Sequence, residues 1–163
     1  MKELFDQYAR YNVWANKKLL DAVAELDEAQ QHREIASSFN SLYKTFFHVW
    51  SAGTIWWLRF QQQNSPVSGD PFNHSMKTLS DGLQHLDMEW QGWVSSKDEA
   101  NFIQKIEYRN SKGDKFHEPI YQVLLHLFNH STYHRGQIVT MLRQLGLEKI
   151  PQTDFIAWVR TVH

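Results

Sequence analysis

The sequence predicts an all-α protein, a four-helix bundle with a small β-hairpin before its last long helix. Four long segments repeat apolar residues with the period of an amphipathic helix, and one of the connections between them alternates as strands do. No internal repeat or shift of composition divides the chain. We therefore expect a single domain over residues 1–163, built around one helical core.

The first two predicted helices lie within residues 2–60. The first runs from about Lys2 to Glu25, and the second begins near Ser41, after serine and asparagine residues that suit a helix cap. Each helix repeats apolar residues at helical spacing: Leu4, Tyr8, Tyr11, Ala15 and Leu19 in the first, and Leu42, Phe46, Val49, Ile55 and Trp56 in the second. Residues 64–71, rich in Pro, Gly and Asn, then predict a loop.

The second half of the chain continues with a helix over about Ser75 to Ser96. Residues 102–108 then alternate loosely, 110–114 predict a turn, and 115–117 can pair back to complete a hairpin.

The fourth helix should begin after Pro119, which a first helical turn tolerates, and end at Leu145, before Gly146. Residues 154–159 predict a short closing helix.

The composition excludes several classes of function. Lys and Arg total 17 against 18 Asp and Glu, without a long basic run, so the sequence does not suggest a nucleic-acid partner. No stretch of about eighteen apolar residues predicts a membrane span, and the charged N-terminus is unlike a signal peptide, so we expect a cytoplasmic protein. The chain has no cysteine, which leaves His, Asp, Glu and backbone oxygen for any metal site.

The fourth helix carries the clearest chemical signal. His130 and His134 are i, i+4 neighbours, about 40° apart around the axis, and so share one face. That face continues through apolar residues, namely Val123, Leu127, Ile138 and Met141. An i, i+4 pair lets two imidazoles reach one metal ion. From this helix alone, hydrogen-bonded core histidines or a partly solvated face fit equally well.

His48 is the one histidine of the second helix, where Thr45, Ala52 and Ile55 share its face. A lone histidine among such neighbours is usually a hydrogen-bonded core residue. Three inward histidines on two helices instead favour a shared ion, since each ring can ligate through one nitrogen and donate from the other. Three protein ligands leave one coordination position open, as in reactive sites. The sequence thus favours a metal site at His48, His130 and His134 and assigns no catalytic residue.

The remaining histidines carry less information. His126 lies at the edge of the apolar stripe, where it could be a fourth ligand, a hydrogen-bonding neighbour of the ligands or a pocket wall. The others are expected at solvated positions or without a partner at ligand spacing: His32, His74, His85, His117 and His163. No Glu interrupts the His pair, so a helical zinc-protease motif is not indicated.

The histidine segment also resembles a known family. Residues 126–138, HLFNHSTYHRGQI, resemble the signature of the DinB family, within the DinB/YfiT-like group of metalloenzymes. Residues 11–20 resemble the first helix of that family, and residues 142–146 with 154–156 resemble its C-terminal end. The resemblance covers nearly the whole chain.

The resemblance implies an up-down-down-up bundle with a long crossover between its second and third helices, and a homodimer. It also implies a three-histidine site for one divalent ion, with zinc, nickel or iron as candidates, and places the ligands at His48, His130 and His134. The three residues that follow His134 would support helix packing: Arg135, Gly136 and Gln137. The glycine among them would permit close approach of a neighbouring helix.

Three functions are compatible with that resemblance. The first is a low-molecular-weight-thiol S-transferase, using a thiol such as bacillithiol, mycothiol or glutathione, which suits a chain without cysteine. The second is a metal-dependent hydrolase using metal-bound hydroxide, and the third is a non-catalytic dimeric metal-binding stress protein. The expected partners are a second copy of the chain and a small-molecule thiol or substrate, with no nucleic acid and no membrane.

Overall fold

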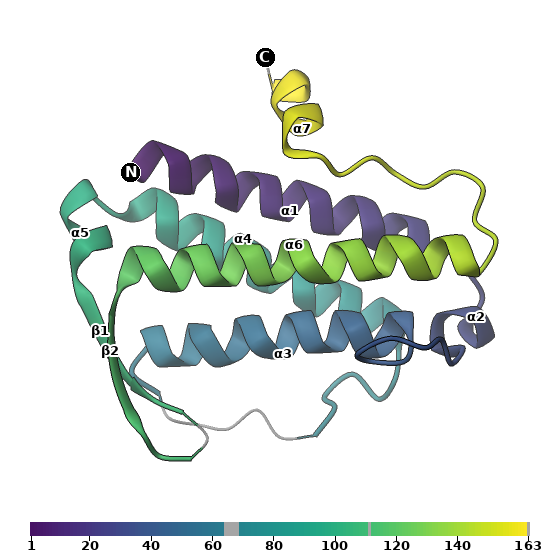
Figure 1. Cartoon of the computed structure of the whole chain (residues 1–163), viewed down its shortest axis with the longest axis horizontal. Coiled ribbons are helices and arrows are strands. Elements are labelled where there is room, and N and C mark those ends of the chain that lie inside the picture. Colours follow the sequence, from purple (N-terminus) through teal and green to yellow (C-terminus); the bar gives the residue numbers. More distant parts are fainter. Residues whose placement is uncertain (64–68, 111, 163) are drawn as a thin grey trace.

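The computed structural model describes residues 1–63, 69–110 and 112–162. Its four long helices are α1 (Lys2–Ala24), α3 (Leu42–Phe60), α4 (Met76–Ser96) and α6 (Ile120–Gln144). Helix α1 packs against α4 and α6, and α3 packs against the same two helices. In Figure 1, α1 and α6 run in one direction, while α3 and α4 run in the opposite direction.

Recognisable end residues account for boundaries of three of the four long helices. Ser41 and Ser75 precede α3 and α4, and each side-chain hydroxyl accepts a hydrogen bond from a backbone N–H in the first turn. Pro119 directly precedes α6, and beyond its end Gly146 has φ +84°, a left-handed conformation that favours glycine. The four predicted long helices are confirmed.

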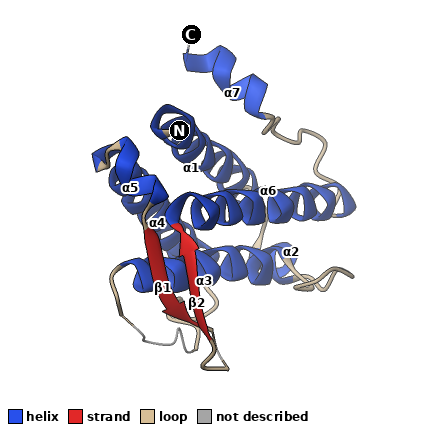
Figure 2. Cartoon of the chain, turned by 60° about the vertical axis from the view of Figure 1, so that its left-hand side comes forward, coloured by secondary structure: helices blue, strands red, loops and turns tan. Residues whose placement is uncertain are grey.

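The shorter elements differ in part from the prediction. Strands β1 (Lys105–Arg109) and β2 (Lys115–Pro119) pair antiparallel, which confirms the hairpin, and Figure 2 shows it beside the end of α3. Residues 102–103 were expected to alternate with the first strand, but they belong to the short helix α5 (Glu99–Ile103). Helix α7 (Phe155–Val162) confirms the closing helix, whereas α2 (Glu28–His32) was not predicted. Of the predicted loop and turn, residues 64–68 and 111 lie outside the described part, as does His163.

The core fills the space between the four long helices. Its fully buried side chains come from all four, and they include Phe5, Leu19, Leu42, Phe46, Leu79, Leu83, Leu124 and Ile138. No helix in the described ranges has both the length and the apolar character needed to cross a bilayer.

A buried polar network fixes the position of α6 against α1 and α4. The Asp87 carboxylate on α4 accepts hydrogen bonds from Asn12 Nδ2 at 3.0 Å and Asn16 Nδ2 at 2.9 Å. Arg135 Nη1 on α6 donates to the side-chain oxygens of the same asparagines at 2.7 and 2.9 Å. Burial raises the pKa of Asp87 to about 7, although these donors and Arg135 oppose the rise. Because unpaired buried polar groups are costly, the network favours one rotation of α6 about its axis.

Candidate metal centre

Three histidine side chains meet between α3 and α6. His48 Nε2 lies 3.0 Å from His130 Nε2, and His134 Nε2 lies 3.1 Å from that same atom. All three rings offer a ligand nitrogen, and these atoms lie within 4.8 Å of one another. Nitrogens bound at about 2.0–2.1 Å to a tetrahedral ion are about 3.3 Å apart. These three residues, called the His triad below, therefore could hold one metal ion.

The local sequence explains why the rings converge. On α6, His130 and His134 share the face that carries the buried Val123 and Met141, so both rings turn toward α3. On α3, His48 lies between the buried Thr45 and Val49. His134 is buried, whereas His48 and His130 are half-buried, so the His triad sits at the edge of the core. The predicted inward orientation is confirmed, and the role as ligands stays a prediction.

The His triad is electrically neutral near pH 7. Burial is the larger cause, and the neighbouring imidazoles the smaller one, of a pKa lowered to about 4 for both His48 and His130. Burial also lowers the pKa of His134, although its hydrogen bond with Gln137 acts in the opposite direction. Since only a neutral imidazole offers a lone pair to a metal, the three rings are prepared to bind a cation without first losing protons.

Gln137 connects one ring of the triad to the loop before α3. His134 Nδ1 lies 2.7 Å from Gln137 Oε1, so the ring donates its proton there and keeps Nε2 free. The amide nitrogen of Gln137 in turn donates to Ser38 Oγ at 3.1 Å. The resemblance assigned Gln137 to helix packing. Its i, i+3 spacing from His134 was the available signal that it orients the ring.

Phe39, in the same loop, covers one side of the site. Its ring stacks on His48 with centroids 3.9 Å apart and an interplanar angle of 18°, and it meets His134 edge-on at 5.5 Å. An aromatic cover excludes water from that side of both rings, which agrees with the lowered pKa values of His48 and His134. Nothing in the local pattern around Phe39 predicted this contact.

His126 lies next to the His triad but outside the group of potential ligands. Its exposed ring has its centroid 5.8 Å from that of His130 and meets Trp56 edge-on at 5.7 Å. Among the residues that the structure describes, the only potential metal cluster consists of His48, His130 and His134. Of the three roles considered for His126, this placement favours a wall beside the site.

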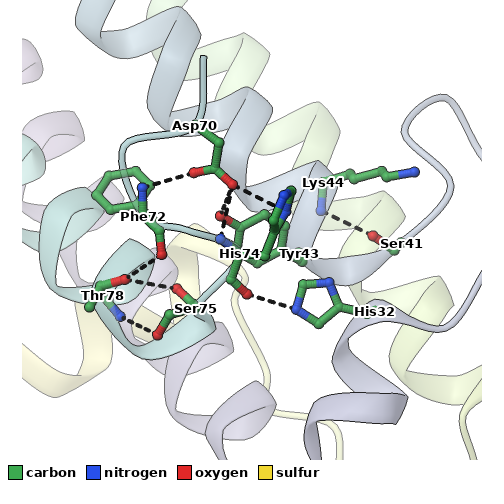
Figure 3. Close-up of polar contacts among 9 residues, drawn as sticks. All are labelled: His32, Ser41, Tyr43, Lys44, Asp70, Phe72, His74, Ser75 and Thr78. Atoms are coloured by element: carbon green, nitrogen blue, oxygen red, sulfur yellow. Dashed lines mark hydrogen bonds and ion pairs between the residues drawn. The ribbon is translucent and has the colours of Figure 1, made fainter.

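Two other histidines belong to a separate polar cluster around Asp70, which Figure 3 shows. Asp70 accepts hydrogen bonds from the Tyr43 hydroxyl and from the backbone N–H groups of Phe72 and His74, and His74 Nδ1 lies 3.2 Å from its carboxylate. His32 Nε2 lies 2.9 Å from the backbone oxygen of His74, and its ring stacks on Tyr43. His74 is exposed, as expected, whereas His32 is half-buried at the end of α2. Their contacts connect the end of α2 and the first turn of α3 to residues 70–74, the segment before α4.

The residues that follow His134 differ in what they contact. Arg135 is 3% exposed and donates to groups on α1 and α6, so its expected role in helix packing is confirmed. Gly136 was expected to permit close helix approach. This expectation is wrong within the described chain, because a Cβ atom added there would meet nothing within 4 Å.

The chemistry of the donor set fits a divalent ion. Three neutral imidazoles suit zinc, nickel, iron and copper, and they add no charge to the metal. No carboxylate or thiol belongs to the cluster in the described ranges. The site can therefore bind a cation and leave at least one coordination position for a ligand from outside.

Known proteins resemble this chain in both sequence and fold. The family model of the DinB family matches residues 1–160. Protein DinB of Bacillus subtilis (strain 168) is 27% identical over 153 residues, which cover 89% of this chain and 87% of that protein. A crystal structure of a DinB-like protein from Bacillus cereus ATCC 10987 superposes with a TM-score of 0.71 at 24% identity, covering 92% of this chain and 95% of the other. This second likeness concerns the fold alone.

Proposed function

Because the chain belongs to the DinB family, we propose that its His triad binds one divalent metal ion and that the loaded site transfers a low-molecular-weight thiol to an electrophilic substrate. The observation that carries the metal proposal is the convergence of three Nε2 atoms, with His130 Nε2 at 3.0 and 3.1 Å from the other two. Zinc, nickel and iron are the candidate ions, since imidazole suits each of them.

The absence of cysteine supports a thiol cosubstrate. When bound to three neutral ligands, a divalent ion keeps its net charge and lowers the pKa of a thiol that binds it. In such a transfer the thiol loses its proton, a sulfur–carbon bond forms, and the leaving group departs with its electron pair. The sulfur comes from the cosubstrate, so the chain needs no nucleophile of its own.

The chain's own residues would prepare and enclose the site. Gln137 holds His134 in the tautomer that keeps Nε2 free, and Phe39 excludes water from one side of His48. His126 and Trp56 lie on the side toward the hairpin, where a substrate could contact an imidazole and an indole ring. The hydrolase alternative is less well supported, because no carboxylate belongs to the cluster in the described part of the chain.

Metal analysis of protein purified without a histidine tag tests the site. We expect about one ion per chain, and a sharp loss in His48→Ala, His130→Ala and His134→Ala. His85→Ala is the matched control, since His85 is an exposed histidine on α4 that pairs with Glu89. Unchanged metal content in all three triad variants would contradict the site assignment.

Thiol transfer needs a separate test. In cobalt-substituted protein, a small thiol should shift the visible spectrum, and thiol conjugation to an electrophile should require both thiol and metal. Turnover of esters or amides without thiol, abolished by chelator, would favour the hydrolase instead. Stoichiometric metal with neither a spectral shift nor turnover across several thiols would favour the non-catalytic metal-binding protein.

We also propose that two copies of the chain associate. Several large apolar side chains remain exposed on α1 and on α7, which packs against α1: Leu4 at 50%, Ile156 at 54% and Val162 at 55%. Analytical ultracentrifugation should give a dimer mass, and Ile156→Asp should shift the equilibrium toward the monomer. A monomer at all concentrations would refute the association.

A further inference from the structure

A cavity of about 530 Å³ lies at the hairpin end of the bundle, apart from the His triad. Its lining includes three basic residues, Arg59, Lys105 and His117, and three aromatic residues, Phe60, Trp93 and Tyr108. No residue of the His triad lines it. Ligand sites of proteins commonly have volumes of about 300–1,000 Å³ and combine apolar walls with a few polar groups, so this cavity has the size and lining of a small-molecule site.

Arg59 is a cationic side chain in the lining of this cavity. Its Cζ lies 4.4 Å from the ring centroid of Trp56 and 4.6 Å from that of Tyr108, in the corner that these two rings form at 70°. Nη2 donates to the backbone oxygen of Arg109 at 3.2 Å. A guanidinium has five N–H donors, so several stay available for an acceptor in its plane. Half-burial lowers the pKa of Arg59, which reflects the cost of keeping this charge away from water.

In the described part of the chain, no acidic side chain forms an ion pair with Arg59. Among the residues described, neither Arg59 nor Lys105 lies within ion-pair distance of an acidic group. The one acidic residue in the lining, Glu107, lies 3.8 Å from Lys115, a lysine outside the cavity lining. Strand pairing sets His117 opposite Glu107, so these two side chains lie on one face of the hairpin. The cavity therefore combines an excess of basic groups with aromatic walls.

We propose that this cavity binds a small organic anion, a carboxylate or a phosphate monoester attached to a flat apolar group. The anion would accept in-plane hydrogen bonds from the guanidinium of Arg59, a group that commonly binds carboxylates and phosphates. The ammonium group of Lys105 would add electrostatic attraction. The flat group would contact Trp93 and Phe60. None of the residues that line this cavity belongs to the His triad, so the proposal does not rest on metal binding.

Calorimetric titration of the full-length protein tests the proposal with four probes: phenyl phosphate, benzoate, inorganic phosphate and benzyl alcohol. We expect one of the two aromatic anions, or both, to bind at least tenfold more tightly than inorganic phosphate and benzyl alcohol. The stronger of the two identifies the acceptor as phosphate or carboxylate. If no aromatic anion binds at millimolar concentration, or if the neutral alcohol binds equally well, the proposal is wrong.

Charge-matched variants then locate the site. Arg59→Gln and Lys105→Gln should each weaken binding about tenfold or more, whereas Lys112→Gln removes the same charge from the hairpin turn, outside the lining, and should leave binding unchanged. Lys105 is exposed, so its replacement tests binding even if Arg59→Gln disturbs the hairpin. His130→Ala should retain anion binding while losing metal. Equal weakening by Lys105→Gln and Lys112→Gln would show general charge attraction and overturn the assignment.

Discussion

Replacing Gln137 by leucine should weaken metal binding without unfolding the protein. The side chain is half-buried, and its Oε1 is 2.7 Å from His134 Nδ1. Leucine has a similar volume but accepts no hydrogen bond, so His134 would lose the partner that fixes its tautomer and ring orientation. The ring could then turn, or place its proton on the nitrogen that faces the other two imidazoles.

Two independent arguments give the size of this effect. Loss of an outer hydrogen-bond partner of a metal ligand typically costs about 10–100-fold in affinity, which equals about 1.4–2.7 kcal/mol. A buried donor left without a partner costs about 1–3 kcal/mol. Since His134 is 3% exposed, water cannot readily replace the lost acceptor. We therefore expect the dissociation constant to rise by one to two orders of magnitude.

Competition titration with a chromophoric chelator measures this constant. Gln137→Glu keeps an acceptor at the same position and should bind metal at least as tightly as the unmodified protein. Gln122→Leu makes the same replacement at an exposed position of α6 and serves as the control. If Gln137→Leu binds metal with unchanged affinity, or if Gln137→Glu weakens binding as much as leucine does, the hydrogen bond does not orient the ligand.

Three further predictions concern helix α4 and the loop that covers the site. On α4, Gly82→Ala should lower the unfolding free energy by about 1–3 kcal/mol, because the new Cβ would lie 2.6 Å from the Phe72 ring. A Cβ added at Gly92 meets nothing within 4 Å, so Gly92→Ala should raise the unfolding free energy by up to about 1 kcal/mol. Urea unfolding measures both changes. The folded pKa of Asp87 is raised from 3.8 to about 7, so this group stabilises the protein at low pH and the stabilisation is lost as the pH rises from about 4 to about 7. Asp87→Asn should therefore remove this part of the fall in unfolding free energy with pH. Phe39→Ala should raise the pKa of His48 in the metal-free protein from about 4 toward 6.5, as measured by NMR titration, and an unchanged value would show that Phe39 does not dehydrate the ring.

The long elements could be predicted because each extends over several helical turns, and α3, α4 and α6 also have a recognisable residue at one end or both: Ser41, Ser75, Pro119 and Gly146. Helices α2 and α5 were missed because each has five residues, too few for a periodic pattern. Both begin with a capping box, Asp27 with Gln30 and Asp98 with Asn101, so capping chemistry was the signal that periodicity could not supply.

Part of the candidate site follows from local sequence spacing, and the rest depends on tertiary packing. The shared face of His130 and His134 follows from spacing along one helix. Whether His48 meets them depends on α3 lying against α6, which no local pattern determines. The Phe39 cover depends in addition on the course of a loop, where Asn40 has φ +55°. Tertiary placement therefore completes a site whose first two members the sequence already indicates.

Helix α6 uses adjacent residues for two different tasks, and this arrangement can be tested. His134 faces α3 in the His triad, while Arg135, about 100° further around the axis, faces α1 and the Asp87 network. The hydrogen bonds of Arg135 therefore help to set the rotation of α6 that aims His130 and His134.

Arg135→Met should lower the unfolding free energy by about 3–5 kcal/mol, because it leaves the buried Asp87 without its counter-charge. Adding Asp87→Leu should recover part of this loss, since both charges are then gone. If the network also aims the imidazoles, the double variant should fold and yet bind metal more weakly than the unmodified protein. A double variant with full stability and full metal affinity would show that apolar packing alone orients α6, and calorimetric unfolding with metal titration distinguishes these outcomes.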